Sequence, residues 1–390
     1  MKIGLEKHSD IKKALKGKKV SVLCNISSVD KELVHVVDVL KKLGVKVQSI
    51  MGPQHGFIID KQDNMKESGH IQRSAEYNIP VYSLYGTSRE PEDRMLADVD
   101  SVVYDLQDVG ARYYTFIYTM AYVMKSCAKL KKQFVVLDRP NPVNGINVEG
   151  GVVQKGFESF VGLYPISNRH GMSVGELALL FNNEFGIGCD LKVIKVSGWD
   201  RKKYWDQYAP KEGRAWILPS PNMPAFDTAM VYPGQCLLEA TNVSEGRGTT
   251  KPFEIFGATF IDHKSFLSHS AIKGLKGVKF RPLFFEPTFN KFKHDMCKGF
   301  QIHVTDRKTF DSLKTSLAII YALKNIYPND FFFTPPPYEY EFEKMPIDIL
   351  LGSDRPRKSL EQGGSFKDFC SAVDEGKKGF LKIRKEYLIY

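Results

Sequence analysis

The stretch from residue 20 to residue 57, VSVLCNISSVDKELVHVVDVLKKLGVKVQSIMGPQHGF, decides the fold class. It begins with a short apolar run, Val20–Cys24, that is typical of a buried strand. From Asp30 the apolar residues follow the period of a helix, and Gly44 supplies a C-terminal cap. Val45–Met51 predicts a second strand, which the loop GPQHGF follows directly. Strand, helix and strand in this order predict a parallel sheet with a right-handed crossover.

The same alternation continues along the chain. Helical spacing covers Arg112–Leu130, and Ser173 with Glu176 forms a capping box that starts another helix. Unusual loops follow three of the strands, at PQHGF, QDVGARYYT and DRPNPVNG. Ligands of such sheets bind at the carboxyl ends of the strands, so these loops are the expected site. The further strands are expected at Val81–Tyr85, Ser101–Leu106, Phe134–Leu137 and Leu191–Val196.

The second half of the chain shows a different pattern. Residues 215–257 are dense in Pro, Gly, Asn and Thr with little period, which predicts a long functional loop. Short separate strands and one helix, Leu313–Leu323, follow. We therefore predict an α/β chain with a domain boundary near residue 255. Residues 1–255 would form a Rossmann-like N-terminal domain with a mostly parallel sheet, and residues 256–390 a smaller α+β C-terminal domain.

Composition indicates an ordinary globular protein. The 390 residues are 43% hydrophobic and 26% charged, which suits two domains with cores and disfavours disorder. The N-terminus has no apolar signal core, and no run approaches the ~18–20 apolar residues of a membrane span. We expect a soluble, cytoplasmic protein without a membrane partner, and the sequence allows a homodimer. Six scattered cysteines without a C-x-x-C pair indicate reduced thiols: Cys24, Cys127, Cys189, Cys236, Cys297 and Cys370.

Charge and motifs disfavour several classes of protein. The net charge is +10, but the lysines gather at the two ends without a groove motif, so we expect no nucleic-acid partner. Neither GxGxxG nor a P-loop occurs, and we predict no cofactor. A serine-hydrolase elbow and the histidine spacings of zinc sites are absent as well. A metal site built by His55, Asp63 and His170 stays open as an alternative.

Carboxylates are the richer source of chemistry. Asp108 follows the predicted strand Ser101–Leu106, while Glu239 and Glu245 lie in LLEATNVSEGRGTTKPFE. Hydrolysis of a glycosidic bond commonly uses one carboxylic acid as proton donor and a second carboxylate. Structural roles stay open too, because Asp108 could cap the following helix and Glu245 could pair with Arg247.

Polar side chains in the predicted loops suit a sugar ligand. Amides and guanidinium groups read its hydroxyls, tyrosines offer apolar faces, and an arginine fork binds a carboxylate. The alternative is that the asparagines only shape turns. The polar candidates are Asn141, Asn144, Asn168, Arg169, His170, Asn222, Asn242 and Arg247, and the aromatic ones are Tyr85, Tyr113, Tyr114 and Tyr164.

Taken in order, these motifs resemble the exo-β-N-acetylmuramidase (NamZ) family, from about Val20 to Gly352 and beyond. The resemblance implies a Rossmann-like domain, a smaller second domain and a site in the cleft between them. It implies hydrolysis of a terminal β-linked N-acetylmuramic acid, whose lactyl carboxylate would give Arg112, Arg169 or Arg247 a purpose. The blocks that carry it are GPQHGF, PVYSLYG, YDLQDVGARYYTFIYTM, LDRPNPVNG, YPISNRHGMSVGELALLFN, PSPNMP, VYPGQCLLEATNVSEGRGTTKPFEIFGA and PPPYEYEFEKMPIDILLGSD.

One position departs from the family pattern. Characterised members are associated with PEHGF, whose glutamate is the favoured catalytic acid, whereas this chain has Gln54. An amide cannot serve as a general acid, so three explanations compete. Glu245 or Asp108 supplies the proton and the substrate's acetamido group acts as nucleophile. The protein cleaves a different bond or sugar. Or it binds a glycan without cleaving it.

The leading hypothesis is a glycoside hydrolase that releases terminal N-acetylmuramic acid, or a related amino sugar, from peptidoglycan fragments. We predict Glu245 and Asp108 as the catalytic carboxylates, with Gln54 as a hydrogen-bonding substitute. The alternatives are a non-catalytic glycan-binding protein and, further off, a metal-dependent hydrolase. The residues predicted to bind substrate are His55, Arg112, Asn141, Asn168, Arg169, His170, Asn222 and Arg247.

Overall fold

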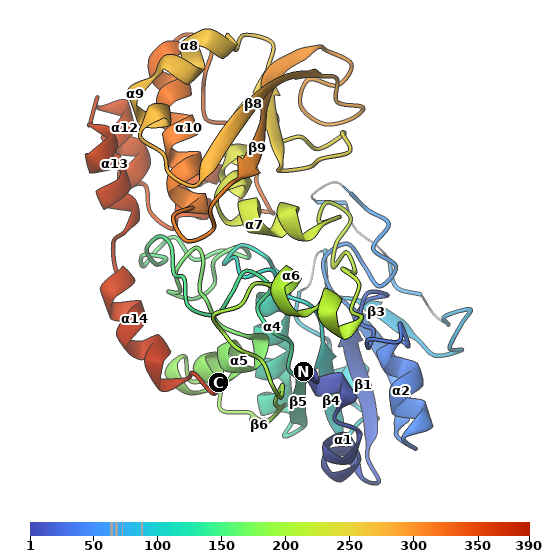
Figure 1. Ribbon diagram of the computed structural model, residues 1–390. Helices are drawn as coiled ribbons and strands as arrows, with labels where there is room; N and C mark the ends of the chain where they lie inside the picture. Colours follow the sequence, from blue (N-terminus) through green and yellow to red (C-terminus); the bar gives the residue numbers. More distant parts are fainter. Residues whose placement is uncertain (63–64, 67–68, 72, 87–88) are drawn as a thin grey trace.

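The computed structural model describes residues 1–62, 65–66, 69–71, 73–86 and 89–390. Its first half contains a six-stranded parallel sheet in the order β3-β2-β1-β4-β5-β6 (Figure 1). The predicted α/β class with a parallel sheet is therefore confirmed. The strands are β1 (Lys19–Cys24), β2 (Lys46–Gly52), β3 (Val81–Ser83), β4 (Ser101–Asp105), β5 (Gln133–Leu137) and β6 (Asp190–Ile194).

Strand alternation divides the apolar residues between the two faces of this sheet. Val102 and Tyr104 of β4 belong to one buried cluster, while Val103 belongs to another. Helices cover both faces, as expected for parallel strands. The helices of this half are α1 (His8–Leu15), α2 (Val36–Lys42), α3 (Asp93–Leu96), α4 (Phe116–Lys129), α5 (Val174–Glu184), α6 (Trp205–Tyr208) and α7 (Phe226–Gln235), with the short 3₁₀ helices η1 (Gly4–Glu6), η2 (Pro210–Glu212) and η3 (Cys236–Ala240).

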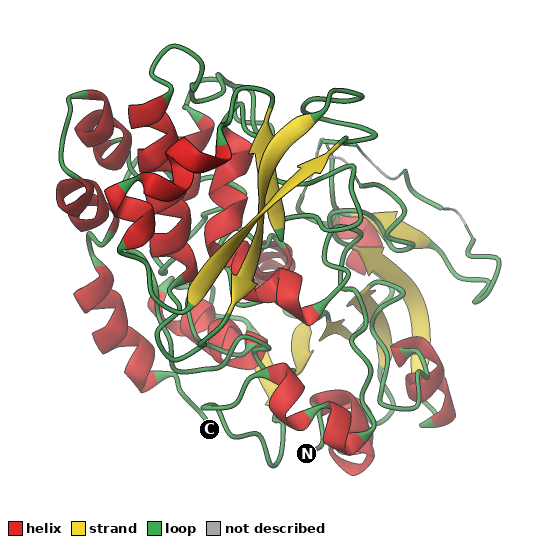
Figure 2. Ribbon diagram, turned by 45° about the horizontal axis from the view of Figure 1, so that its top comes forward, coloured by secondary structure: helices red, strands yellow, loops and turns green. Residues whose placement is uncertain are grey.

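The second half carries a three-stranded antiparallel sheet in the order β7-β9-β8, beside a group of helices (Figure 2). Helix α14 runs down past this group to the first half (Figure 1), where Arg384 donates to the backbone oxygens of His170 and Gly171. The elements are β7 (Ile255–Ala258), β8 (Val278–Phe285), β9 (Cys297–Val304), α8 (His263–Ser268), α9 (Ser270–Lys273), α10 (Ser312–Ile326), α11 (Pro346–Leu351), α12 (Arg355–Glu361), α13 (Phe366–Val373) and α14 (Lys377–Glu386).

Three predictions about elements differ from the structure. The part of the chain after β7, all of it described, contains seven helices, α8 to α14, and not one. The helix expected from Asp30 begins only at Val36, because the Asp30 carboxylate accepts from the backbone N–H groups of Glu32 and Val34 and forms a turn. Residues 215–257 are not one long loop, since α7 and η3 lie within them. Pro233 and Gly234 hid that helix, and the glycine is needed there: a Cβ would lie 1.9 Å from the Ser312 backbone oxygen of α10.

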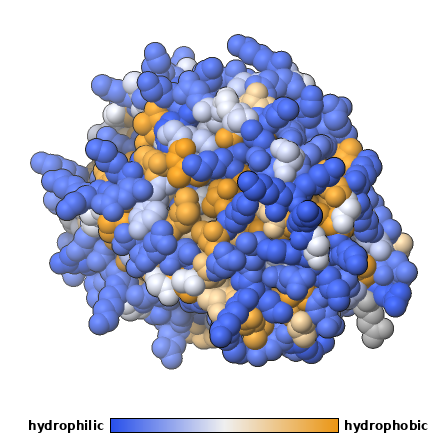
Figure 3. Space-filling view, turned by 90° about the horizontal axis from the view of Figure 1, so that it is seen from below, coloured by the Kyte–Doolittle hydropathy of each residue, from blue (hydrophilic) through white to orange (hydrophobic). Residues whose placement is uncertain are grey.

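The two halves share one core. A single cluster of buried apolar side chains includes Ile117 of α4, Met230 of α7 and Ile319 of α10. The division near residue 255 stays a prediction. From below, hydrophilic residues surround a discontinuous band of hydrophobic ones (Figure 3). Among the described residues, no helix has the length and apolar character needed to span a membrane.

Candidate active site

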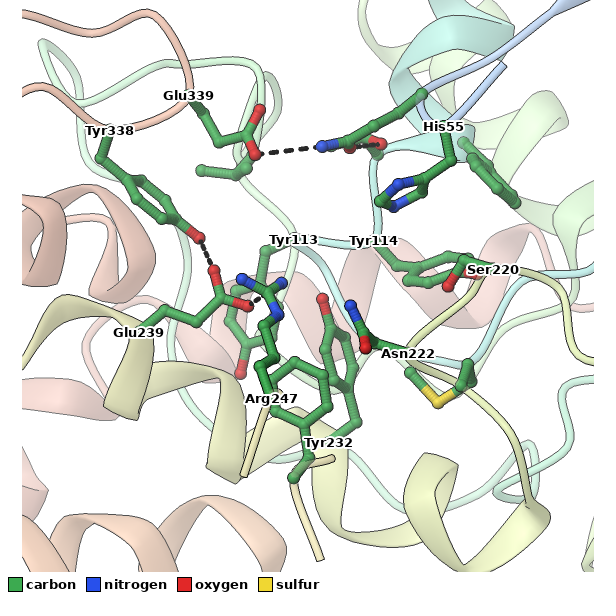
Figure 4. Close-up of a pocket in the computed structure, with 16 residues that line it drawn as sticks. His55, Tyr113, Tyr114, Ser220, Asn222, Tyr232, Glu239, Arg247, Tyr338 and Glu339 are labelled. Carbon is green, nitrogen blue, oxygen red and sulfur yellow. Dashed lines mark hydrogen bonds and ion pairs between the residues drawn. The ribbon is translucent and has the colours of Figure 1, made fainter. Parts of the chain in front are cut away.

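A small pocket lies where the carboxyl edge of the parallel sheet meets the second half of the chain (Figure 4). Segments far apart in sequence form its wall: the loop after β2, the approach to α4, the loop before α7, the region from α7 to Phe253, and the loop after α10. The lining residues are Gln54, His55, Tyr113, Tyr114, Thr115, Phe116, Val161, Ser220, Asn222, Met223, Tyr232, Glu239, Arg247, Phe253, Tyr338 and Glu339.

Gln54 makes a directed hydrogen bond to a buried carboxyl group. The Thr115 hydroxyl donates to Gln54 Oε1 over 2.5 Å, which fixes the orientation of the amide. Gln54 Nε2 therefore faces Glu339 and donates to its Oε1 over 3.0 Å, and it also contacts the Tyr85 hydroxyl at 3.2 Å. Tyr85 in turn donates to Glu339 Oε2 over 3.0 Å. The side chain at position 54 thus touches a carboxyl group that arrives from the other half of the chain.

Glu339 holds its proton more strongly than an ordinary glutamate. Burial, together with the negative charge of Glu239, raises the pKa of Glu339 to about 6. Hydrogen bonds from Tyr85 and Gln54 favour the charged form, but they offset only part of that rise. A carboxyl group with this pKa is protonated in about a tenth of molecules at pH 7, far more often than an ordinary glutamate, and a proton donor must be protonated.

Glu239 forms an ion pair in the pocket wall. Arg247 Nη2 lies 2.8 Å from its Oε1, and the Tyr338 hydroxyl donates to its Oε2 over 2.6 Å. Burial lowers the pKa of Arg247, but the negative charges of Glu239 and Glu245 raise it by more, so the guanidinium stays positive. In Figure 4 Glu239 and Glu339 lie on one side of the pocket, and His55 lies across from them.

His55 is a neutral acceptor. Burial lowers the pKa of this imidazole to about 4, so it carries no charge at neutral pH. Its Nδ1 lies 2.7 Å from the backbone oxygen of Lys61, which places the ring proton on Nδ1. Nε2 is then left with a lone pair that can accept a hydrogen bond from a sugar hydroxyl.

Two models of the exo-beta-N-acetylmuramidase NamZ family match this sequence, the N-terminal one over residues 20–227 and the C-terminal one over residues 230–390. The chain belongs to the NamZ family. The resemblance drawn from the motifs is thereby confirmed. The peptidoglycan beta-N-acetylmuramidase NamZ of Bacillus subtilis (strain 168) is 42% identical over 382 residues, which cover 98% of this chain and 89% of the relative.

Solved structures agree with this membership. A DUF1343 family protein from Bacteroides fragilis NCTC 9343 superposes with a TM-score of 0.88 at 31% identity. A second DUF1343 family protein from the same organism superposes with a TM-score of 0.77 at 27% identity. Each alignment covers 100% of this chain and 98% of the other. The similarity in fold therefore extends over the full length of this chain and is not limited to one half of it.

Four of the residues predicted to act in catalysis or substrate binding line the pocket: Gln54, His55, Asn222 and Arg247. Asn222 also donates to the backbone oxygen of Gln62 over 2.8 Å, so its amide holds the loop after β2 in place.

The two carboxylates predicted as catalytic do not line the pocket. Asp108 accepts from the backbone N–H of Gly110 over 2.6 Å and lies 3.2 Å from His170 Nε2. Glu245 lies 2.9 Å from Lys291 Nζ; burial raises its pKa, but the charges of Lys291 and Arg247 outweigh this and lower it. A glutamate with a lowered pKa is a poor proton donor, which disfavours Glu245 as the acid, and Asp108 lies outside the pocket lining.

The remaining predicted residues hold loop backbone. Arg112 donates to the carbonyl oxygens of Gly151, Ile166 and Leu350, over 3.0, 3.0 and 2.6 Å. The other members of this group behave alike. Asn141 donates to the Met172 oxygen, Asn168 to the Leu350 oxygen, Arg169 to Glu149 and to the Val143 oxygen, and His170 accepts from the Met172 N–H.

Glu339, which lines the pocket, was not among the residues expected from the sequence, and Glu239 was only one of several candidate carboxylates. The available signal was the block PPPYEYE, whose charged and aromatic residues alternate in a segment without helical or strand period. Of the metal alternative, Asp63 lies outside the described residues, and His170 does not line the pocket beside His55. Within the described ranges, no group of three or more His, Cys, Asp or Glu side chains could hold a metal ion.

Proposed function

We propose that this NamZ family member is a glycoside hydrolase that releases a terminal N-acetylmuramic acid from peptidoglycan fragments, with Glu339 as its general acid. The family and the peptidoglycan beta-N-acetylmuramidase relative support the activity. The observation that carries the assignment of the acid is the 3.0 Å hydrogen bond between Gln54 and Glu339. Position 54 has no carboxyl group, but Glu339, to which Gln54 donates a hydrogen bond, has one.

Each pocket residue has a part in this proposal. Glu339 gives its proton to the glycosidic oxygen as the bond to the leaving sugar breaks. Positive charge then builds up at the anomeric carbon, where the Glu239 carboxylate stabilises it. Water adds to that carbon and releases one proton, and Glu339 regains its proton from the solvent. His55 Nε2 accepts from a ring hydroxyl, and Arg247 is the lining residue with a charge that suits the lactyl carboxylate.

A protein that binds glycans without cleaving them is not favoured. That alternative rested on Gln54 alone, and Glu339 removes its basis. The comparisons also lead to a relative named as a peptidoglycan beta-N-acetylmuramidase over 98% of this chain.

The test uses a chromogenic β-N-acetylmuramide beside the matching β-N-acetylglucosaminide. We expect wild-type protein to release the chromophore from the muramide. Glu339→Gln should abolish release, whereas the double variant Gln54→Glu/Glu339→Gln, which moves the acid across the same hydrogen bond, should restore part of it. The matched control is Glu341→Gln, which removes a carboxylate that pairs with Lys344 on the same loop. Full activity of Glu339→Gln would disprove the assignment of the acid.

A further inference from the structure

A second, larger hollow adjoins the catalytic pocket and has no role so far. It is also more open to solvent than that pocket. One wall is the loop after β2, and the other is formed by residues 248–250 together with the end of β8 and the residues after it. In Figure 1 the blue loop after β2 comes up against the yellow and orange loops of the second half. The lining residues are Asp60, Lys61, Gln62, Lys66, Gly248, Thr249, Thr250, Phe285, Glu286, Thr288 and Phe289.

Both walls continue segments that line the catalytic pocket. The backbone oxygen of Lys61 holds His55 at 2.7 Å, and the backbone oxygen of Gln62 holds Asn222 at 2.8 Å. On the other wall, Gly248 directly follows Arg247. The same stretches of chain therefore border both the hollow and the pocket.

The wall near Gly248 is firmly built. The backbone N–H and the hydroxyl of Thr288 both donate to the Gly248 oxygen, over 2.9 and 3.0 Å. Gly248 has φ +81°, and a Cβ there would lie 2.7 Å from the Phe289 backbone oxygen. Only glycine fits this close approach, so the two segments are held as one surface.

The chemistry of the hollow suits a sugar. Phe285 and Phe289 are only partly buried, and the ring of Phe285 packs over Gly257, 2.7 Å from where a Cβ would stand. Threonine hydroxyls stand next to these rings, and Lys61 with Asp60 adds charged groups at the rim. Aromatic faces beside hydroxyls are the common way in which proteins bind pyranose rings.

We infer that this groove binds the amino-sugar residues on the leaving-group side of the cleaved bond, an inference that rests on the proposed function. The catalytic pocket is the smaller of the two, so a glycan longer than its terminal sugar must extend from it. The groove starts beside His55 and Arg247, provides aromatic faces for the next rings and leads to solvent. Substrate selection would then favour a glycan chain over an isolated muramide.

The test compares two substrates in the variant Phe289→Ala. The first is the chromogenic muramide, which has no sugar beyond the bond. The second is a peptide-free tetrasaccharide of alternating N-acetylmuramic acid and N-acetylglucosamine. We expect the KM for the tetrasaccharide to rise about tenfold, because a ring face is lost, and the KM for the muramide to stay within about twofold. The inference would be overturned if KM rose equally for both substrates or stayed unchanged for the tetrasaccharide. It would also be overturned if the variant affected only peptide-bearing fragments.

A matched control and a binding measurement complete the design. Phe284→Ala removes a phenyl ring from the position before Phe285 in β8. Phe284 points to the opposite face of the strand from Phe285 and is 60% exposed, so its loss should leave both KM values unchanged. Titration with the trisaccharide that remains after release of the terminal muramic acid does not require cleavage. Wild type should bind it about tenfold more tightly than Phe289→Ala. Equal affinities would refute the groove even if no substrate were hydrolysed, whereas absent hydrolysis with intact binding would refute only the proposed activity.

Discussion

Two polar clusters lie at the same edge of the parallel sheet and differ in what their side chains bind. In the catalytic pocket, Gln54, Glu239 and Glu339 interact with other side chains. In what we call the scaffold cluster, Asp108, Arg112, Asn141, Asn168, Arg169 and His170, most hydrogen bonds go to backbone N–H and C=O groups. Both clusters are buried and both come from loop motifs, so residue type and position in the sequence do not separate them.

The difference shows which polar groups are available for chemistry. A guanidinium that holds three carbonyl oxygens, as Arg112 does, stabilises the loops and cannot turn to a ligand. A carboxyl group that meets an amide and a tyrosine hydroxyl, as Glu339 does, can gain or lose a proton without loss of the backbone around it. Polar side chains bonded to other side chains are therefore available for chemistry, whereas those bonded to backbone groups support the loops. The following variants test this distinction.

The largest expected effect is on catalysis. Glu339→Gln should lower kcat/KM by about 10²–10⁴-fold, the usual contribution of a general acid, while the unfolding midpoint changes little because the replacement is isosteric. Asp108→Asn, the matching change in the scaffold cluster, should keep kcat/KM within about threefold. Hydrolysis of the chromogenic muramide and thermal unfolding, measured on the same preparations, decide between them. A large loss of turnover in a folded Asp108→Asn protein would erase the distinction.

The next effect is on stability. Arg112→Met should lower the free energy of unfolding by about 3–5 kcal/mol, because the carbonyl oxygens of Gly151 and Ile166 lose the guanidinium and that of Leu350 keeps only Asn168 of its two side-chain donors. Urea denaturation measures it, with Arg281→Met as control, since the exposed Arg281 contacts the side chain of Gln301. If the loss were below about 1 kcal/mol, the scaffold cluster would not support the loops as described.

The third effect is on pH dependence. Because the acid must be protonated, and the pKa of Glu339 is raised to about 6, kcat/KM should be constant well below pH 6 and fall about tenfold per unit above it. Gln54→Glu places two carboxyl groups within hydrogen-bond distance, where they share one proton, so the descending limb should move to higher pH. Rates from pH 4.5 to 9 test both statements, and a limb unaffected by Gln54→Glu would contradict the proposed contact.

The smallest effect is at a helix cap next to the scaffold cluster. The Ser173 hydroxyl accepts from Glu176 N and donates to Asp138, so Ser173→Ala should cost about 1–2 kcal/mol of stability with turnover within about twofold. Ser365→Ala removes the equivalent cap from the exposed helix α13 and should cost less. Equal losses in urea denaturation would mean that the bond to Asp138 contributes nothing.

The sequence predicted the sheet well, because the short apolar runs and the capping box at Ser173 act locally. It failed at α7, where close packing on α10 requires the Gly234 that masks the helix. The site was only half predicted: Gln54 and His55 follow a strand, as ligand-binding residues of such sheets do. Glu339 was missed because it reaches the pocket from a loop without period, 285 positions beyond its partner Gln54.

That separation along the chain has a consequence during synthesis. The ribosome produces the N-terminal half first, and its parallel sheet can form while the rest is still being made. The proposed proton donor enters only with residue 339 of 390, and Arg384, which ties α14 to the loop at His170, follows later still. Nascent chains therefore carry most of the substrate pocket yet stay inert until translation is nearly complete. A truncated product would retain the sheet and have no hydrolytic activity.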